Sequence, residues 1–183
     1  MGISRLAGIA LLFAGTIVAQ APQFTSDGRL VKPDNYREWV FLSSGLGMTY
    51  GPAANADQNS NPEFDNVFVT PAAYRAFVQT GKWPDKTMFV LEVRSSESHG
   101  SINHGGHFQS DLVAIETEVK KPGGQWTFYG FGQSAGPAKA IPTSASCYQC
   151  HRQNGAVDNT FVQFYPTLLS VAKAKGTLRG DTH

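Results

Sequence analysis

Two cysteines and a histidine stand together late in the chain, in the segment Cys147-Tyr148-Gln149-Cys150-His151. This C-x-x-C-H pattern is the attachment sequence of haem c, in which each thiol adds to a haem vinyl group. The adjacent histidine then falls beneath the iron as its proximal ligand. A disulfide or a redox dithiol would also use two cysteines, but neither requires the histidine. The spacing therefore predicts one covalent haem c held by Cys147 and Cys150, with His151 on the iron.

The N-terminal residues have the pattern of an export signal. Arg5 precedes an apolar run over residues 6–19, which is shorter than the roughly 20 residues that span a bilayer. Such a run fits the apolar core of a secretory signal peptide. We expect residues 1–20 to be this signal and residues 21–183 to form a single haem-binding domain in an exported, periplasmic protein. A retained membrane anchor is the alternative.

Composition narrows the classes of partner. The 183 residues are 41% apolar, and the formal net charge is +1. This apolar content is too high for a disordered chain and is sufficient for one hydrophobic core. No basic stripe or charge run is present, so nucleic acid and anionic membranes are poor candidates for partners.

The elements that must position the haem are mostly strands. Aromatic and β-branched residues predict strands at residues 38–43, 66–69, 87–94, 112–119 and 126–131. Residues 122–124, Pro-Gly-Gly, predict a hairpin turn. The strand at 87–94 is almost continuously apolar, so we expect both of its faces to be covered.

Two helices are expected. The first covers residues 72–80, with Thr70 as its N-cap, Pro71 in its first turn and Gly81 as its C-cap. The second covers residues 166–175 and ends before Gly176. Strands with flanking helices indicate an α+β domain.

The position of the haem motif excludes two common classes of cytochrome. Small helical electron carriers attach haem near the N-terminus and supply a methionine ligand from the C-terminal part, but no methionine follows His151 here. A four-helix cytochrome does not fit a chain of strands and turns. A six-coordinate periplasmic electron carrier remains an alternative, with Met48 as an open candidate for a sulfur ligand. Met88 is expected to be a core residue.

Several segments resemble the family of cytochrome P-460 and its relative cytochrome c′-beta, over roughly residues 33–170. The resemblance is strongest in the haem motif and in the run that follows it. Lys86 departs from the family, which more often has glycine there. The segments that carry the resemblance are Tyr36 to Val40, Phe64 to Val69, Gly81 to Thr87, and Cys147 to His151 followed by Gly155 to Pro166.

The resemblance implies an antiparallel β-sheet with flanking helices, usually in a homodimer. It also implies a five-coordinate haem with an open or apolar side opposite His151. One branch of the family oxidises hydroxylamine and carries a lysine cross-linked to the haem ring. The other branch binds nitric oxide or similar gases and lacks that link. A soluble electron-transfer partner is expected if the protein turns over hydroxylamine.

Candidate residues for this chemistry follow from their types and settings. Lys82, Lys86 and Lys139 are candidates for a haem cross-link, although the expected strands at 38–43, 66–69 and 87–94 contain no lysine. Glu92, in an apolar strand, is a candidate proton relay with a raised pKa, and His107 is the other.

Other polar residues are expected to be exposed. Glu116 and Glu118 are expected at the surface. His99, His104 and His107 are close enough in sequence for a metal site, but a solvated loop is the expectation.

Overall fold

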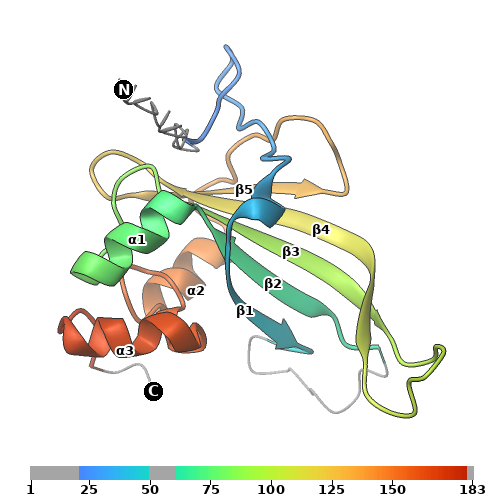
Figure 1. The fold of residues 1–183 in the computed structure, drawn as a ribbon. Coiled ribbons are helices and arrows are strands. Elements are labelled where there is room, and N and C mark those ends of the chain that lie inside the picture. Colours follow the sequence, from blue (N-terminus) through green and yellow to red (C-terminus); the bar gives the residue numbers. More distant parts are fainter. Residues whose placement is uncertain (1–20, 50–60, 181–183) are drawn as a thin grey trace, which may run out of the picture.

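A computed structural model describes residues 21–49 and 61–180 of the chain. The expected signal peptide, residues 1–20, lies outside the described residues. Five strands form one antiparallel sheet in which neighbours in sequence are neighbours in space (Figure 1). Within residues 21–49 and 61–180, three α-helices and two short 3-10 helices complete the α+β fold. The elements are η1 (Tyr36–Glu38), β1 (Val40–Leu46), β2 (Phe64–Val69), α1 (Pro71–Thr80), β3 (Met88–Glu97), β4 (Phe108–Lys120), β5 (Trp126–Gly132), α2 (Ser146–Asn154), η3 (Val162–Phe164) and α3 (Pro166–Ala174).

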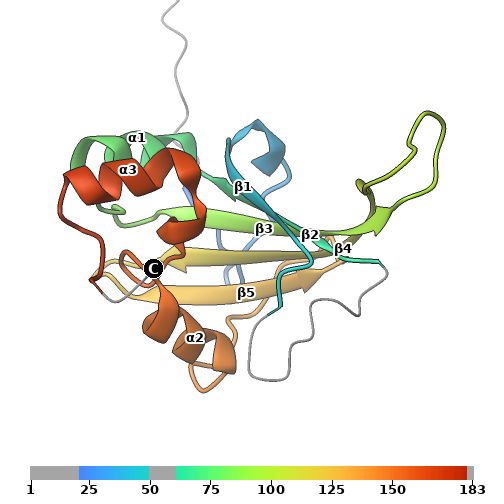
Figure 2. The ribbon, with the colours of Figure 1, turned by 90° about the horizontal axis from the view of Figure 1, so that it is seen from below.

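The two faces of the sheet support separate hydrophobic clusters. The face covered by the three helices, here called the helix-side face, packs Phe89 and Phe128 against Phe77 of α1 and Leu168 of α3. The opposite face, here called the back face, is covered by the N-terminal segment, including η1, and by residues near 138. Figure 2 shows α1 and α3 side by side over one end of the sheet, with α2 beside β5. The prediction that β3 is covered on both faces is confirmed.

The expected strands and helices are present, with two differences at the level of single elements. Thr70 precedes α1 as predicted, but its side chain makes no capping hydrogen bond. Gly81 does end α1 in the left-handed region, at φ 70°. The haem motif was expected in no particular element, whereas the structure places it on the helix α2. None of the helices within residues 21–49 and 61–180 is long and apolar enough to cross a membrane.

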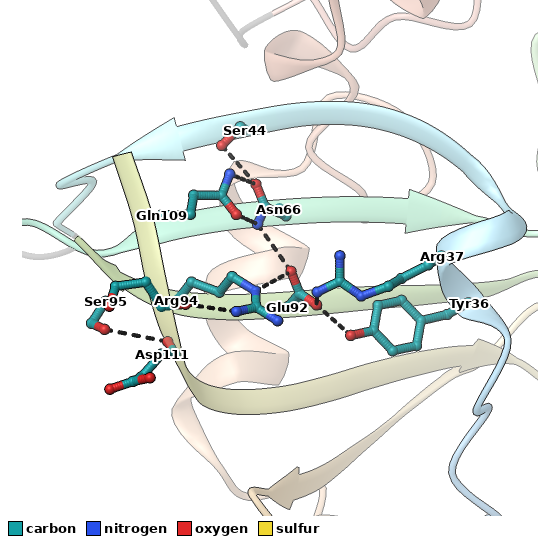
Figure 3. A network of polar contacts seen from close by, with 10 residues as sticks. Tyr36, Arg37, Ser44, Asn66, Glu92, Arg94, Ser95, Gln109 and Asp111 are labelled. Carbon is teal, nitrogen blue, oxygen red and sulfur yellow. Dashed lines mark hydrogen bonds and ion pairs between the residues drawn. The ribbon is translucent and has the colours of Figure 1, made fainter. Parts of the chain in front are cut away.

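Glu92 lies in a polar network on the back face, and the expected raised pKa is wrong (Figure 3). Its side chain is fully buried, and it accepts hydrogen bonds from Tyr36 and Arg37 as well as one of 2.8 Å from Arg94. Asn66 adds a longer bond of 3.2 Å. Burial alone would raise the pKa of Glu92, but these hydrogen bonds and the arginine charges outweigh it and lower the pKa. The sequence pattern showed the apolar strand but not these partners.

We expect Glu92→Gln to destabilise the fold strongly at neutral pH, because it leaves Arg94 without its buried counter-charge. The expected loss is about 3–5 kcal/mol of unfolding free energy, measured by denaturant unfolding of the holoprotein. A carboxyl with a lowered pKa stabilises the fold above its unfolded-state pKa, and this contribution disappears as the pH falls through its folded-state pKa. The gap between variant and wild type should therefore shrink in acid, and a gap that stays constant with pH would contradict the account.

Candidate functional site

The two cysteines and the histidine of the motif share the helix α2, which packs against the helix-side face. Cys147 and Cys150 are three residues apart and therefore lie on the same side of the helix. Both are free thiols and both are partly exposed. Two unpaired thiols on one helical face, with the histidine directly after them, are the donor set that a covalent haem requires.

His151 is oriented from the protein side through one ring nitrogen. Its Nδ1 lies 3.0 Å from the carbonyl oxygen of Asn159, so Nδ1 carries the proton and donates it to that oxygen. The ring packs edge-on against Phe128, with 4.6 Å between centroids. It also packs in a tilted arrangement against Phe161, with 4.5 Å between centroids. Burial lowers the pKa of His151 despite the Asn159 bond, which favours a neutral imidazole. The neutral ring has a lone pair on Nε2, the form that binds iron.

The carbonyl that orients His151 belongs to a tight turn with unusual backbone angles. Asp158 and Asn159 both adopt positive φ, at 50° and 60°. A side chain on Gly155 would meet the backbone of Asn159 at 2.5 Å, so only glycine fits there. Lys120 on β4 holds the turn through a 2.5 Å ion pair with Asp158. The run after the haem motif therefore builds the support of the histidine.

A buried hydrogen bond anchors the same turn to the region after α1. Trp83 donates from Nε1 to the hydroxyl of Thr160 at 2.9 Å, and that hydroxyl donates to the carbonyl of Val157 at 2.7 Å. Trp83 and Thr160 are both almost fully buried. Two segments about 77 residues apart in sequence are thus joined directly behind His151.

We expect Thr160→Val to lower the unfolding free energy of the holoprotein by about 1–3 kcal/mol, because it leaves the indole N–H of Trp83 buried without an acceptor. Denaturant unfolding at neutral pH measures this loss. Thr117→Val is the matched control, since the Thr117 hydroxyl is also buried but has no hydrogen-bond partner among the described residues. Equal losses in the two variants would contradict the anchoring role of Thr160.

Glu118 lies next to His151, which corrects the expectation that it is a surface residue. It is 8% exposed, and its Oε2 is 3.4 Å from Nδ1 of His151. Burial, with a smaller effect from Asp158, raises the pKa of Glu118 to about 8. Sequence reasoning assigned the raised pKa to Glu92, one strand away and on the other face.

Two further carboxyl groups lie on the helix-side face beyond Glu118. Glu116 is two residues along β4 and therefore points to the same side, about 7 Å away. Asp65 on β2 faces the same side. Asp65 pairs with Val93 of β3 and Glu116 pairs with Leu91 of β3, and residues two apart on a strand share one face. Burial, aided by the charges of Glu63 and Glu116, raises the pKa of Asp65 to about 6. Partial burial also raises the pKa of Glu116, although its side chain remains accessible to solvent.

Met48 shares this part of the helix-side face. A Cβ placed on Gly45 would clash with the sulfur of Met48 and would lie 3.6 Å from the Cβ of Asp65. The absence of a side chain at Gly45 therefore lets the thioether approach the strand beside Asp65. Met88, by contrast, is 3% exposed in the back-face core, as expected.

The remaining candidates are not brought to His151. His107 lies where the hairpin returns to β4, with Nδ1 3.4 Å from the hydroxyl of Ser96. His99 and His104 lie in the loop of the same hairpin, which extends away from the helices in Figure 2. Within the described residues, no group of His, Cys, Asp or Glu has the arrangement of a metal site. The described residues therefore give no support for a metal site in this loop, and the role of His107 as a proton relay stays a prediction.

The three candidate cross-linking lysines are all exposed. Lys82 and Lys86 flank the turn between α1 and β3, and Lys86 has a positive φ of 67°. Lys139 follows Ala138, which pairs with Leu30 over the back face. The strands β1, β2 and β3, as the structure bounds them, contain no lysine. The structure therefore does not place the amine of Lys82, Lys86 or Lys139 on the helix-side face beside Asp65.

The residues around α2 fit a covalently bound haem. The thiols of Cys147 and Cys150 are free, the Nδ1 of His151 is occupied by Asn159, and its Nε2 is the nitrogen that remains for iron. Oε2 of Glu118 is buried and accepts no hydrogen bond from any residue within the described segments, despite its 3.4 Å contact with His151. Such an orphaned acceptor beside a metal-binding histidine is the usual position of a residue that orients the ligand.

Comparison with known protein families matches residues 33–162 to the family described as Cytochrome P460. A search of curated proteins found no relative that matches the chain. The family match spans well over half of the chain and includes the C-x-x-C-H motif, and members of the family bind a covalently attached haem c. The protein is therefore a haem c cytochrome of the cytochrome P460 family.

Proposed function

We propose that Cys147 and Cys150 hold the haem, that His151 binds the iron, and that the protein binds hydroxylamine at the opposite iron position and oxidises it. The observation that carries this proposal is that the strand register places the carboxyls of Asp65 and Glu116 on the helix-side face. Burial there raises the pKa of both groups. When bound, the haem supplies the site at which the nitrogen binds and through which electrons leave. The chain must supply groups that accept protons.

Proton acceptance is the task that the carboxyl pair fits. Oxidation of hydroxylamine releases protons together with electrons, so a base within hydrogen-bond reach of the substrate accelerates it. A base is most useful when its pKa lies near the working pH, and the pKa of Asp65, about 6, meets that condition. The electrons pass to a soluble one-electron acceptor, the partner class that the proposal requires.

Nitric oxide binding without turnover is the second candidate function. It is favoured by the absence of lysine from β1, β2 and β3 and by the half-buried apolar residues Val67 and Leu91 on the helix-side face. A neutral diatomic loses little hydration in such surroundings, whereas a charged ligand loses much. This function needs only the vacant iron position and no base.

Peptide mapping by mass spectrometry, combined with hydroxylamine-dependent reduction of a dye acceptor, separates the two functions. Turnover, with or without a haem adduct on Lys82, Lys86 or Lys139, supports the oxidase. Tight nitric oxide binding with no turnover and no adduct supports the gas-binding function instead. If neither ligand perturbs the haem spectrum at millimolar concentration, the hypothesis that the iron has an open, reactive position is wrong.

We also propose that the protein is exported to the periplasm and forms a homodimer. Export is supported by the apolar run at residues 6–19 and by the oxidising compartment in which haem c proteins with such signals are matured. N-terminal sequencing of the mature protein should begin near residue 20 or 21, and a start at Met1 would contradict cleavage. The mass in solution by light scattering tests the dimer.

A further inference from the structure

The geometry around α2 points to Glu118 as a positioning residue that acts through His151 to strengthen its bond to the haem iron. This inference rests on the proposed ligation by His151 and concerns the side of the haem away from the substrate. Glu118 does not touch substrate in this account. It sets the orientation and the electron donation of the residue that does bind the iron.

The strand register aims Glu118 at the histidine. Glu118 pairs with Phe89 on one side and with Phe128 on the other, and both aromatic residues belong to the helix-side core. Phe128 also packs edge-on against the ring of His151. The carboxyl of Glu118 therefore lies between these two aromatic residues, and its Oε2 is 3.4 Å from Nδ1 of His151.

Two acceptors thus face one donor. The carbonyl of Asn159 takes the shorter bond from Nδ1, at 3.0 Å, and is fixed by the turn that Thr160 and Lys120 hold. Glu118 is the second acceptor, and no described residue other than His151 offers it a donor. Lys120 is ion-paired with Asp158 and not with Glu118. Glu118 is therefore the buried carboxyl in contact with the histidine.

An acceptor on Nδ1 makes the imidazole a stronger donor at Nε2 and fixes the plane of the ring. In the holoprotein, a stronger bond from His151 would stabilise ferric over ferrous iron. Loss of the Glu118 acceptor should therefore weaken the iron–histidine bond and raise the reduction potential. Loss of a group that hydrogen-bonds a metal ligand commonly alters metal affinity or activity by about 10–100-fold.

The test compares Glu118→Leu, which fills the same space without an acceptor, with Glu118→Gln, which keeps an acceptor oxygen of similar reach. Replacing a buried acid by an apolar residue of similar volume is commonly tolerated by the fold. Resonance Raman spectroscopy of the ferrous holoprotein reports the iron–histidine stretching frequency, and redox titration reports the potential. Thr117→Val, on the same strand but facing the back face, controls for disturbance of β4.

We expect Glu118→Leu to lower the stretching frequency and raise the potential, with Glu118→Gln close to wild type and Thr117→Val unchanged. An unchanged frequency in Glu118→Leu, equal shifts in Leu and Gln, or an equal shift in Thr117→Val would each overturn the inference. Failure of the proposed ligation is seen separately: the iron–histidine band would then persist in His151→Ala. Loss of that band in His151→Ala, with no effect of Glu118→Leu, would overturn only the role of Glu118.

Discussion

Replacing both Cys147 and Cys150 with alanine is expected to abolish covalent haem attachment. The physical reason is that these are the only cysteines of the chain, and both lie as free thiols on the same side of α2. After denaturation and extraction with acidified acetone, the haem of the wild type should remain with the polypeptide. Essentially all of the haem of the double variant should be found in the extract.

Each single variant provides an internal control, because one remaining thiol can still form one thioether bond. Cys147→Ala and Cys150→Ala should therefore each retain part of the haem after extraction. Tyr148→Phe, within the same helix, should retain haem fully, since it loses only the hydrogen bonds of its hydroxyl near β5. Complete extraction of haem from the wild type would refute covalent attachment.

The carboxyl pair of the helix-side face, Asp65 and Glu116, should set the pH dependence of hydroxylamine oxidation. If Asp65 accepts a proton from hydroxylamine, kcat/KM should rise as the pH increases through about 6, where Asp65 loses its own proton. Asp65→Asn should lower kcat/KM by about 10²–10⁴-fold and remove that rise. Glu116→Gln should shift the rise to lower pH, because the charge of Glu116 contributes to the raised pKa of Asp65.

Hydroxylamine itself changes protonation state in the same pH range, so the comparison between variants decides the result. A rise that is identical in wild type and Asp65→Asn would belong to the substrate and would contradict the role of Asp65. Glu97→Gln, on an exposed part of β3, is the control for loss of a carboxylate elsewhere. Its pH profile should match that of the wild type.

Much of the fold follows from local sequence signals. The alternating strands, the Pro-Gly-Gly turn and the Gly81 end of α1 each depend on neighbouring residues, and the structure confirms them. The helix α2 was not predicted, because its sequence has little apolar periodicity. Its stability comes from contacts with residues distant in sequence, such as the packing of Tyr148 on Phe128.

The pKa shifts of the buried carboxyl groups could not be predicted from neighbouring residues in the sequence. Glu92 and Glu118 have similar settings in sequence, each between apolar or β-branched neighbours. Glu92 meets Arg37 and Arg94, which lower its pKa. Glu118 lies beside the histidine from α2, where burial and the charge of Asp158 raise its pKa. The segments that supply these partners are joined by tertiary packing and not by sequence proximity. The alternation of Glu116 and Glu118 with Ile115, Thr117 and Val119 was the one available signal, but it reads equally as a solvent-facing edge.

The absorption spectrum of the resting ferric holoprotein, recorded at room temperature before and after addition of hydroxylamine, shows whether the iron has an open position. We expect a high-spin spectrum, because His151 is the only protein ligand proposed for the iron, and a clear shift when hydroxylamine binds. Met48→Ala should leave the high-spin spectrum in place. A low-spin spectrum that disappears in Met48→Ala and does not respond to hydroxylamine in the wild type would contradict the account. It would show that the thioether beside Gly45 and Asp65 closes the iron and that the protein is an electron carrier.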